Sequence, residues 1–283
     1  MKALIIIFLI LGIFGGASYV GYKMFVQPQV ALKKEKLLPP PPPPPDPTVP
    51  EFNKCLAIRK SGKVLEAREA FYGFIERYPE STKIEEAKNL LGEINTDILL
   101  STMHAPEKQE YIVQRGDVIT RVAAHLKTPG ELLVRANNLQ GPMLRIGQKL
   151  SVSPGEFSLV ISHKQNKVTV LNKGKFFKQY AVLAWPPSHV KTVTGSKAPP
   201  TAKIQGKVTD KVSWLNGGRV TYMDKGFVGA THWIQINIPG CTLHSEADEN
   251  SPQKPPGSGT RLTPDALDEL AAMLSKGDPV TLE

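Results

Sequence analysis

Apolar and small residues without a charge fill positions 3–22, at the start of the chain. About 20 such residues span the hydrocarbon core of a bilayer as a helix, so the pattern predicts a transmembrane anchor within residues 1–28. A cleaved signal peptide fits the same stretch, with Lys2 as its positive start and the small residues Gly15 and Ala17 near a cleavage point. Both interpretations make this segment a membrane-targeting one.

A proline-rich stretch follows. Seven consecutive prolines occupy positions 39–45, and Pro47 and Pro50 come soon after them. Proline lacks an amide hydrogen and favours the polyproline II conformation, so the run makes a semi-rigid spacer of roughly 22 Å. Residues 29–50 are therefore expected to be a linker that holds the following part of the chain away from a membrane surface.

Helical spacing of apolar residues appears between residues 51 and 104. Two runs recur three and four positions apart: Leu65, Ala67, Ala70, Phe71, Phe74 and Ile75, then Ala87, Leu90, Leu91, Ile94 and Ile98. Tyr78-Pro79 is expected to end the first helix and Ser81 to cap the second. The letters from Gly62 to Pro79, G-x-x-x-E-A-x-x-x-F-x-x-F-x-x-x-Y-P, resemble one tetratricopeptide-like helical hairpin. One repeat is too little for a stable solenoid, so this hairpin is expected to pack on a protein partner or on its own neighbours, with Cys55 buried as a small apolar residue.

Residues 110–153 predict the order strand, helix, helix, strand. Alternation at 111–113 precedes a turn at Gly116-Asp117, and a helical stripe follows at Ile119, Val122, Ala123 and Leu126. Thr128 is expected to cap a second helix that begins at Pro129 and ends at Asn137-Asn138. Gly147 breaks the chain before a last alternating stretch at 149–152.

The letters of this segment resemble the LysM family: Y-I-V-Q-R-G-D-V-I at the start, N-N-L in the centre and L-R-I-G-Q-K-L at the end. The resemblance implies a shallow groove, between the first strand-helix loop and the second helix-strand loop, that binds glycans containing N-acetylglucosamine. The positions carried over to this groove are Gly116, Asp117, Val118, Asn138, Leu139 and Ile146. Val118 stands where the family usually has Thr. Purely structural roles stay open: a turn for Gly116, a helix cap for Asn138, and core positions for Leu139 and Ile146.

From Phe157 onward, short alternating stretches and frequent turns predict a small β-sandwich or barrel. Strands are expected at 159–161, 168–171 and 176–183, with turns at Gln165-Asn166 and Lys173-Gly174. A helix is expected near the end of the chain, with Thr263 as its cap, Pro264 in its first turn and Gly277 closing it.

Four motifs in this region occur in the order of the L,D-transpeptidase (YkuD-type) domain and resemble it. They are K-A-P-P-T-A-K-I from 197, G-A-T-H-W-I-Q-I from 229, C-T-L-H-S-E from 241 and G-S-G-T-R-L from 257. The resemblance extends over residues 157–283. It implies a domain that acts on the peptidoglycan stem peptide through a cysteine thiolate, an activating imidazole and backbone donors for the oxyanion. The family's histidine falls on His244 and its arginine on Arg261, which would bind a peptide carboxylate or pair with Glu246 or Asp265.

The family's cysteine has no counterpart in this sequence. Without a gap it falls on Gly259, with one deletion it falls on Thr260, and Ser258 replaces the preceding histidine. Neither glycine nor an unactivated threonine hydroxyl has the nucleophilicity of a thiolate.

Two other side chains stay open as an atypical nucleophile or as structural residues. Thr260 is one; Cys241, three residues before His244, is the other. An odd spacing along a strand directs side chains to opposite faces, which predicts that Cys241 and His244 do not meet and that Cys241 is buried. His244 itself is either the retained base or a structural histidine, and His232 is expected to be structural.

The charge and the cysteine content limit which kinds of partner and ligand the protein is expected to bind. The net charge is +9, and it is uneven: residues 157–225 hold twelve Lys or Arg and two Asp, whereas residues 226–283 hold three basic and eight acidic residues. This balance fits a solvated surface or an acidic wall polymer. No recognition motif accompanies it, so nucleic acid is not an expected partner. Two cysteines make no disulfide framework or zinc motif, and neither a metal nor a cofactor is expected.

The sequence therefore predicts a multidomain α+β protein of the bacterial cell envelope, anchored in the cytoplasmic membrane, or secreted, with its bulk outside. Its expected partners are the membrane, peptidoglycan glycan and stem peptide, with a possible protein partner at 51–104. Whether it is an enzyme stays open. It is either a binding protein that does not cross-link or an active L,D-transpeptidase with an unusual nucleophile. A third hypothesis makes the helical hairpin the functional part.

Overall fold

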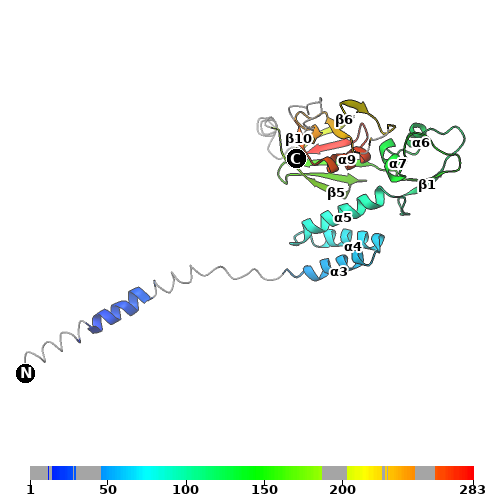
Figure 1. The fold of residues 1–283 in the computed structure, drawn as a ribbon. Helices are drawn as coiled ribbons and strands as arrows, with labels where there is room; N and C mark the ends of the chain where they lie inside the picture. Colours follow the sequence, from blue (N-terminus) through cyan, green and yellow to red (C-terminus); the bar gives the residue numbers. More distant parts are fainter. Residues whose placement is uncertain are drawn as a thin grey trace, which may run out of the picture. The chain divides into compact units, whose positions relative to one another are not determined.

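The computed structural model describes Gly12, Gln29 and residues 15–27, 46–186, 203–224, 227, 229–245 and 259–283, which fall into two units, Met1–Asp46 and Pro47–Glu283. In the first unit residues 15–21 are helical and continue into a π-helical turn, η1, at Tyr22–Val26 (Figure 1). Within the described parts of the chain, no helix combines the length and apolarity that crossing a membrane takes. Most of the expected anchor, and the proline run at 39–45, lie outside the described residues. The anchor and the spacer stay predictions.

Three helices, not two, open the second unit: α3 (Val49–Lys60), α4 (Val64–Arg77) and α5 (Ile84–Leu99). The predicted hairpin corresponds to α4 and α5, and α3 adds a helix that the hairpin interpretation lacked. Phe52 on α3 explains the addition, because its ring packs edge-on against Phe71 and Phe74 at centroid distances of 6.1 and 5.7 Å. The expected cap at Ser81 is also corrected: α5 starts three residues later, and the Ser81 hydroxyl accepts from Lys83 N at 3.0 Å.

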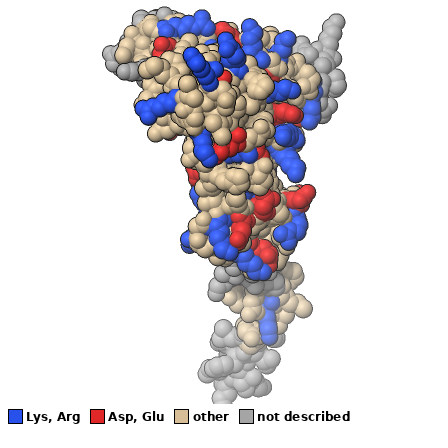
Figure 2. Space-filling view, turned by 90° about the vertical axis from the view of Figure 1, so that its right-hand side faces the viewer, with Lys and Arg blue, Asp and Glu red and all other residues tan. Residues whose placement is uncertain are grey.

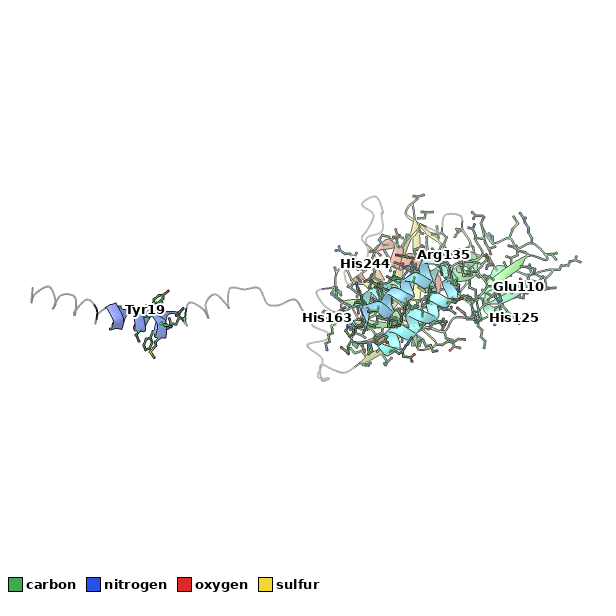
Figure 3. All side chains as sticks on the ribbon, turned by 90° about the horizontal axis from the view of Figure 1, so that it is seen from below. Tyr19, Glu110, His125, Arg135, His163 and His244 are labelled. Carbon is green, nitrogen blue, oxygen red and sulfur yellow. The ribbon has the colours of Figure 1, made fainter. Side chains whose placement is uncertain are left out.

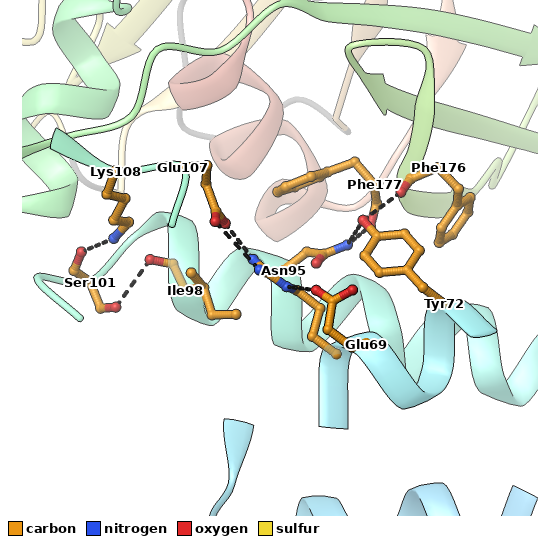
Figure 4. Close-up of polar contacts among 10 residues, drawn as sticks. Glu69, Tyr72, Asn95, Ile98, Ser101, Glu107, Lys108, Phe176 and Phe177 are labelled. Atoms are coloured by element: carbon orange, nitrogen blue, oxygen red, sulfur yellow. Dashed lines mark hydrogen bonds and ion pairs between the residues drawn. The ribbon is translucent and has the colours of Figure 1, made fainter. Parts of the chain in front are cut away.

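The helical segment packs on its own chain, at strand β5 (Lys175–Ala181). Figure 4 shows the contacts that join α4 and α5 to this strand. The Tyr72 hydroxyl donates to Phe176 O at 2.9 Å, and the buried Asn95 amide donates to Phe177 O at 2.8 Å and to the Tyr72 hydroxyl at 3.0 Å. β5 is the last strand in the hydrogen-bonded order of the sheet. Its carbonyls at Phe176 and Phe177 accept hydrogen bonds from these side chains in place of a neighbouring strand.

Residues 109–152 form the predicted strand, helix, helix, strand unit. Its elements are β1 (Gln109–Ile112), α6 (Ile119–His125), α7 (Gly130–Ala136) and β2 (Lys149–Val152). The two strands pair antiparallel, and Ile119, Leu133 and Leu150 are fully buried between strands and helices. One prediction was wrong here: Pro129, not Thr128, precedes α7 as its cap residue, and the Thr128 hydroxyl donates to Ser153 O at 3.0 Å.

A nine-stranded mixed sheet makes up most of the rest of the chain. Its hydrogen-bonded order is β10-β9-β8-β6-β11-β3-β4-β5, with β7 paired to β6. The bounds are β3 (Phe157–Ser162), β4 (Lys167–Asn172), β6 (Ile204–Leu215), β7 (Gly218–Val220), β8 (Thr231–Ile236), β9 (Leu243–His244), β10 (Thr260–Arg261) and β11 (Pro279–Leu282). The predicted turns join β3 to β4 and β4 to β5, with positive φ at Asn166, Lys173 and Gly174. The motif from 197 lies outside the described residues except Lys203 and Ile204.

The sheet curls until its two ends meet. Leu183 N, in the chain that leaves β5, donates to Arg261 O at 2.8 Å, and Arg261 N donates to Ala184 O at 2.9 Å. This bridge links β10, at one end of the order, to the segment after β5, at the other. Of the two predicted forms, the structure is therefore the barrel-like one.

Helix α9 (Pro264–Met273) follows β10 and packs on β8. Its start is as predicted, because the Thr263 hydroxyl accepts from Ala266 N at 3.3 Å and Pro264 is the first residue. Its end is not: the helix stops at Met273, and Gly277, with φ +102°, belongs to a later turn in which the Asp278 carboxylate accepts from Ser275 N at 2.7 Å.

Helix α7 of the LysM-like unit docks directly on α9 and β6. The Arg135 guanidinium pairs with the Asp268 carboxylate on α9 at 2.8 Å and also donates to Asp268 O at 2.8 Å. On the same helix, Glu131 pairs with Lys211 of β6 at 3.0 Å. Leu132 lies in the same hydrophobic core as the strands of the large sheet. The two folded parts thus share an interface made of core residues and charge pairs.

Replacing Asn95 with Ala should lower the free energy of unfolding by about 1–3 kcal/mol, because the Phe177 carbonyl would stay buried without its donor. Urea denaturation of the protein measures it. Asn89→Ala is the matched control on the same helix. The Asn89 amide accepts from the Gln179 side chain of β5 at 2.8 Å, but this hydrogen bond is exposed to water, so its loss should change stability by less than about 0.5 kcal/mol. Equal effects of the two substitutions would contradict the role given to Asn95.

Candidate functional site

The first loop of the LysM-like unit is built around Asp117. Its carboxylate accepts from the Tyr111 hydroxyl and from Gln114 N, both at 2.7 Å. These hydrogen bonds, that from Gln114 first, hold the pKa of Asp117 below its ordinary value. Gly116 precedes it at φ +89°, a conformation that favours glycine. Both residues therefore fix the shape of the loop.

Val118 is the cap residue of α6. Its backbone is extended, at φ −126° and ψ 146°, its carbonyl accepts from Arg121 N and Val122 N at 3.0 Å, and its side chain makes no capping hydrogen bond. A threonine hydroxyl at this position would be placed to accept from the first turn of the helix. The substitution of Val for the usual Thr therefore removes a helix cap, and it leaves an apolar side chain 45% exposed.

The second loop begins with the N-N-L sequence, which is a helix terminator. Asn138 has φ +48°, its N–H donates to Arg135 O at 3.1 Å, and Leu139 N donates to Val134 O at 2.9 Å. This is the hydrogen-bond pattern of a Schellman motif, so the capping interpretation of Asn138 is confirmed. Leu139 is half-buried against the core of the unit.

Asn137 is a residue whose role the motif alone did not indicate. Its side-chain amide donates to Leu133 O at 2.9 Å and Ser151 O at 2.8 Å, and its oxygen accepts from Ser151 N at 2.7 Å. It therefore fastens the end of α7 to strand β2. An asparagine beside a helix end is a signal for such a role that the sequence contains. The sequence does not show that Ser151, on β2, is its partner.

The two loops lie side by side. Gly147 N donates to Val113 O and Val113 N donates to Gln148 O, both at 2.9 Å. Ile146, one of the residues expected in the core or the groove, is 71% exposed. The core interpretation of Ile146 is wrong because the Gly147 turn carries the side chain outward. Val118 and Ile146 are thus exposed apolar side chains on two adjoining loops.

His244 lies in the short strand β9 and is almost fully buried (Figure 3). Its Nδ1 lies 2.8 Å from Ser245 O. A carbonyl oxygen only accepts, so Nδ1 carries a hydrogen and Nε2 is the atom that accepts a proton in the neutral ring. This is the orientation that a general base at His244 takes.

Gly259 lies directly against the His244 ring. A Cβ built on Gly259 would be 2.4 Å from His244 Cδ2, 2.8 Å from His244 Nε2 and 2.6 Å from Thr242 O. The position onto which the family cysteine aligns without a gap therefore does face the imidazole. The ring occupies the space that a side chain there would fill.

Thr260 and Arg261 alternate across the parallel pair of β10 and β9. Thr260 pairs with Leu243 and Arg261 with His244. Paired residues of neighbouring strands share a face, so Thr260 lies with Leu243 on the core side and Arg261 with His244 on the other. Thr260 is fully buried, and its hydroxyl has no hydrogen-bond partner in the described part of the protein.

Cys241 also lies in the core, in the same hydrophobic cluster as Leu243, and it is fully buried. Burial raises the pKa of its thiol to about 12. The prediction that Cys241 is a buried residue is confirmed. At neutral pH the thiolate fraction that nucleophilic attack takes is negligible.

His232 is a structural histidine, as predicted. It is 2% exposed, with Nδ1 2.8 Å from the Ser213 hydroxyl and Nε2 3.2 Å from the Asp268 carboxylate. Burial tends to raise the pKa of Asp268, but the hydrogen bond from His232 and the charge of Arg135 outweigh it and hold this pKa below the ordinary value. Within the described ranges, no three His, Cys, Asp or Glu side chains gather where a metal ion would bind.

Comparison with known proteins identifies one module. Residues 111–153 match the LysM domain model. The LysM interpretation of this segment is thereby confirmed. No curated protein matches the chain.

Solved structures with similarity to the chain include L,D-transpeptidases. One from Mycobacterium smegmatis is 16% identical, with 49% of this chain and 64% of that one covered and a TM-score of 0.29. One from Stackebrandtia nassauensis is 17% identical (45% and 55% covered, TM-score 0.29), and L,D-transpeptidase 1 from Mycobacterium tuberculosis is 14% identical (48% and 66% covered, TM-score 0.28). The chain spans less than two thirds of each of these three. They belong to the family that the C-terminal motifs resemble, and a likeness of this size says nothing about activity.

Val118→Thr should raise the free energy of unfolding of the LysM module by about 1 kcal/mol, because the hydroxyl supplies the missing cap of α6. Hydrogen exchange at the amides of α6 measures this locally. Val118→Ser, which also supplies a hydroxyl, should act in the same direction, and Val118→Ala should not. No difference between Thr and Ala would show that this position does not cap the helix.

Proposed function

We propose that this protein binds peptidoglycan: the LysM module holds the glycan, and the C-terminal domain holds the stem peptide without cross-linking it. For the glycan, the support is the LysM match together with the exposed Val118 and Ile146 on adjoining loops. Apolar side chains meet the faces of sugar rings, while backbone groups at Gly116 and in the loop hydrogen-bond the N-acetyl amides. Asp117, Asn138 and Leu139 hold these loops in shape.

The observation that carries the second half of the proposal is the contact of Gly259 with the His244 ring. Acyl transfer by a thiolate takes a side chain in front of the imidazole, and here that position has none. His244 and Arg261 share a face, so a peptide carboxylate bound there would meet both an imidazole and a guanidinium. They are therefore the stem-peptide residues of this proposal.

The alternative is an active L,D-transpeptidase that uses Cys241 or Thr260. The burial of both side chains in the core and the high pKa of the Cys241 thiol support the non-catalytic proposal over this one. Either nucleophile would have to leave the core before it met the imidazole.

The proposal extends to the envelope. Residues 1–28 would anchor the protein in the cytoplasmic membrane, or be cleaved from it, and residues 29–50 would space the folded part from the membrane. The bulk would then lie outside the cytoplasm, where both modules find wall substrate. Figure 2 shows Lys and Arg interspersed with Asp and Glu on the face that it displays, which supports a solvated surface with a basic excess. A partner protein for residues 51–104 would use the surface that α3, α4 and α5 leave free of β5.

Ile146→Asp should reduce the fraction of the full chain that sediments with insoluble peptidoglycan by about fivefold, because a carboxylate replaces an apolar contact with sugar. Met143→Asp is the matched control: it lies in the same loop, is 89% exposed and is not a groove position. Sedimentation in mild detergent, followed by quantification of the pellet, measures both. No sedimentation of the unaltered protein would remove the glycan function, and equal loss in both variants would remove Ile146 from the groove.

The full chain should form no cross-linked dimer from tetrapeptide-bearing muropeptides and no acyl adduct, because the nucleophile's position holds only a glycine. Mass spectrometry of the muropeptides and of the intact protein tests both. Loss of a family nucleophile costs orders of magnitude in rate, so background turnover is expected. His244→Ala and Arg261→Ala should each weaken stem-peptide binding. If the protein does form cross-linked dimer, and if Cys241→Ala or Thr260→Ala abolishes it, the alternative of an active L,D-transpeptidase is correct.

A further inference from the structure

A cleft of about 720 Å³ opens between the LysM module and the C-terminal sheet. One wall is the end of α7 and the loop after it, with Arg135, Asn138 and Gln140. The other wall is formed by Tyr222, Asp224 and Phe227, which lie between β7 and β8 in the sequence. Both modules thus line one hollow, and Leu100 at the end of α5 is also part of the lining.

The cleft shares two residues with the expected LysM groove. Asn138 and Leu139 are groove positions of the LysM resemblance, and both also line the cleft. The chain from Asn138 to Gly141 follows one wall of the cleft. A linear ligand that lies across the second LysM loop is therefore led toward Tyr222.

The charged residues of the cleft are occupied by partners of their own. The Arg135 guanidinium is held by Asp268 through the carboxylate at 2.8 Å and the carbonyl at 2.8 Å. The Asp224 carboxylate accepts from Thr221 N at 2.8 Å and from the Thr221 hydroxyl at 2.9 Å. The other polar groups of the lining are the amides of Asn138 and Gln140, which are exposed. Gln140 Nε2 donates to Asn138 Oδ1 at 3.2 Å, and the remaining donor and acceptor positions of both amides are open to a ligand. Such a lining favours a neutral ligand rich in hydroxyls and amides over an anion.

Tyr222 supplies an aromatic surface that is fixed in place. Its ring lies on the backbone of Gly130, where a Cβ would be 2.4 Å from Tyr222 Cζ, so only glycine permits this approach. The Tyr222 phenol is protonated at neutral pH and able to donate. Burial, and secondarily the charge of Glu131, raise its pKa further. A half-exposed ring with a polar tip offers a sugar both a face and a hydrogen bond.

We propose that this cleft is a second saccharide site, which binds the N-acetylhexosamine units that continue beyond those held by the LysM loops. The inference rests on the proposed glycan function of the LysM module and extends it across the module boundary. The charge pairs between α7 and the C-terminal domain keep the two walls at a fixed spacing, so the site exists before the ligand arrives. Its consequence is a preference for long glycans over short ones.

The test is calorimetric binding of N-acetylglucosamine oligomers of three and six units to the full chain. The hexamer should bind about tenfold more tightly than the trimer. Tyr222→Ala and Gln140→Ala should each weaken hexamer binding by about fivefold and leave trimer binding unchanged. Tyr222→Phe, which keeps the ring, should retain most of the hexamer affinity. Gln235→Ala is the control, an exposed amide of β8 outside the cleft, and it should change neither affinity.

Each outcome separates the cleft from the LysM groove. If trimer and hexamer bind equally and the cleft variants behave as the unaltered protein, the second site is overturned and the glycan function stands. If neither oligomer binds, the glycan function fails and the cleft proposal fails with it. Thermal unfolding of every variant shows whether it is folded. Should Tyr222→Ala unfold, Gln140→Ala decides, because Gln140 is exposed and its loss leaves the core intact.

Discussion

The Asp268 carboxylate is the contact on which the arrangement of the two modules depends. It accepts from Arg135 of the LysM module on one side and lies against His232 of the C-terminal core on the other. Lys211 and Glu131 form a second pair beside it, and these four charged side chains are largely buried. Breaking a buried charge pair leaves an uncompensated charge, which costs several kcal/mol. Helix α7 therefore cannot move away from α9 without a large loss of free energy.

This interface fixes the position of the LysM loops relative to the second candidate site, the face of His244 and Arg261. A LysM module on a flexible linker would concentrate a catalytic domain near the wall without orienting it. Here the two LysM loops, the cleft at Tyr222 and the face of His244 and Arg261 belong to one compact unit. A glycan strand held on the loops and in the cleft would present its peptide branches in a fixed relation to that face. Such positioning suits a protein that recognises peptidoglycan. Recognition, unlike cross-linking, does not require a thiol nucleophile.

The sequence predicted the features that local rules control. Alternation and the turn residues Asn166 and Lys173-Gly174 located the first three strands of the sheet, and the N-N-L letters located the end of α7. The LysM motif also predicted groove positions, and the structure shows that Gly116, Asp117 and Asn138 hold the loops in shape. The sequence did not predict α3 as a separate helix, because α3 buries only Phe52 and Cys55, too few residues for a periodic pattern.

Contacts between residues far apart in the sequence were not predicted, for a different reason. Asn95 meets Phe177, and Arg135 meets Asp268, across more than 80 and 130 residues of sequence. No local pattern encodes such a pair. The aligned position of the missing cysteine was visible in the sequence, but the contact of Gly259 with the His244 ring depends on the parallel pairing of two strands of two residues each.

The most direct test of this account is ¹⁵N relaxation of the amides in the LysM module and in the C-terminal sheet, which reports the rotational tumbling of each. One correlation time for residues 110–153 and 157–283 is the predicted result, because the Asp268 and Glu131 pairs hold α7 against α9 and β6. Charge reversal at Arg135 by substitution with Glu should separate the two times. A shorter correlation time for the LysM module in the unaltered protein would mean independent tumbling. It would contradict the shared interface, the cleft and the positioning role together.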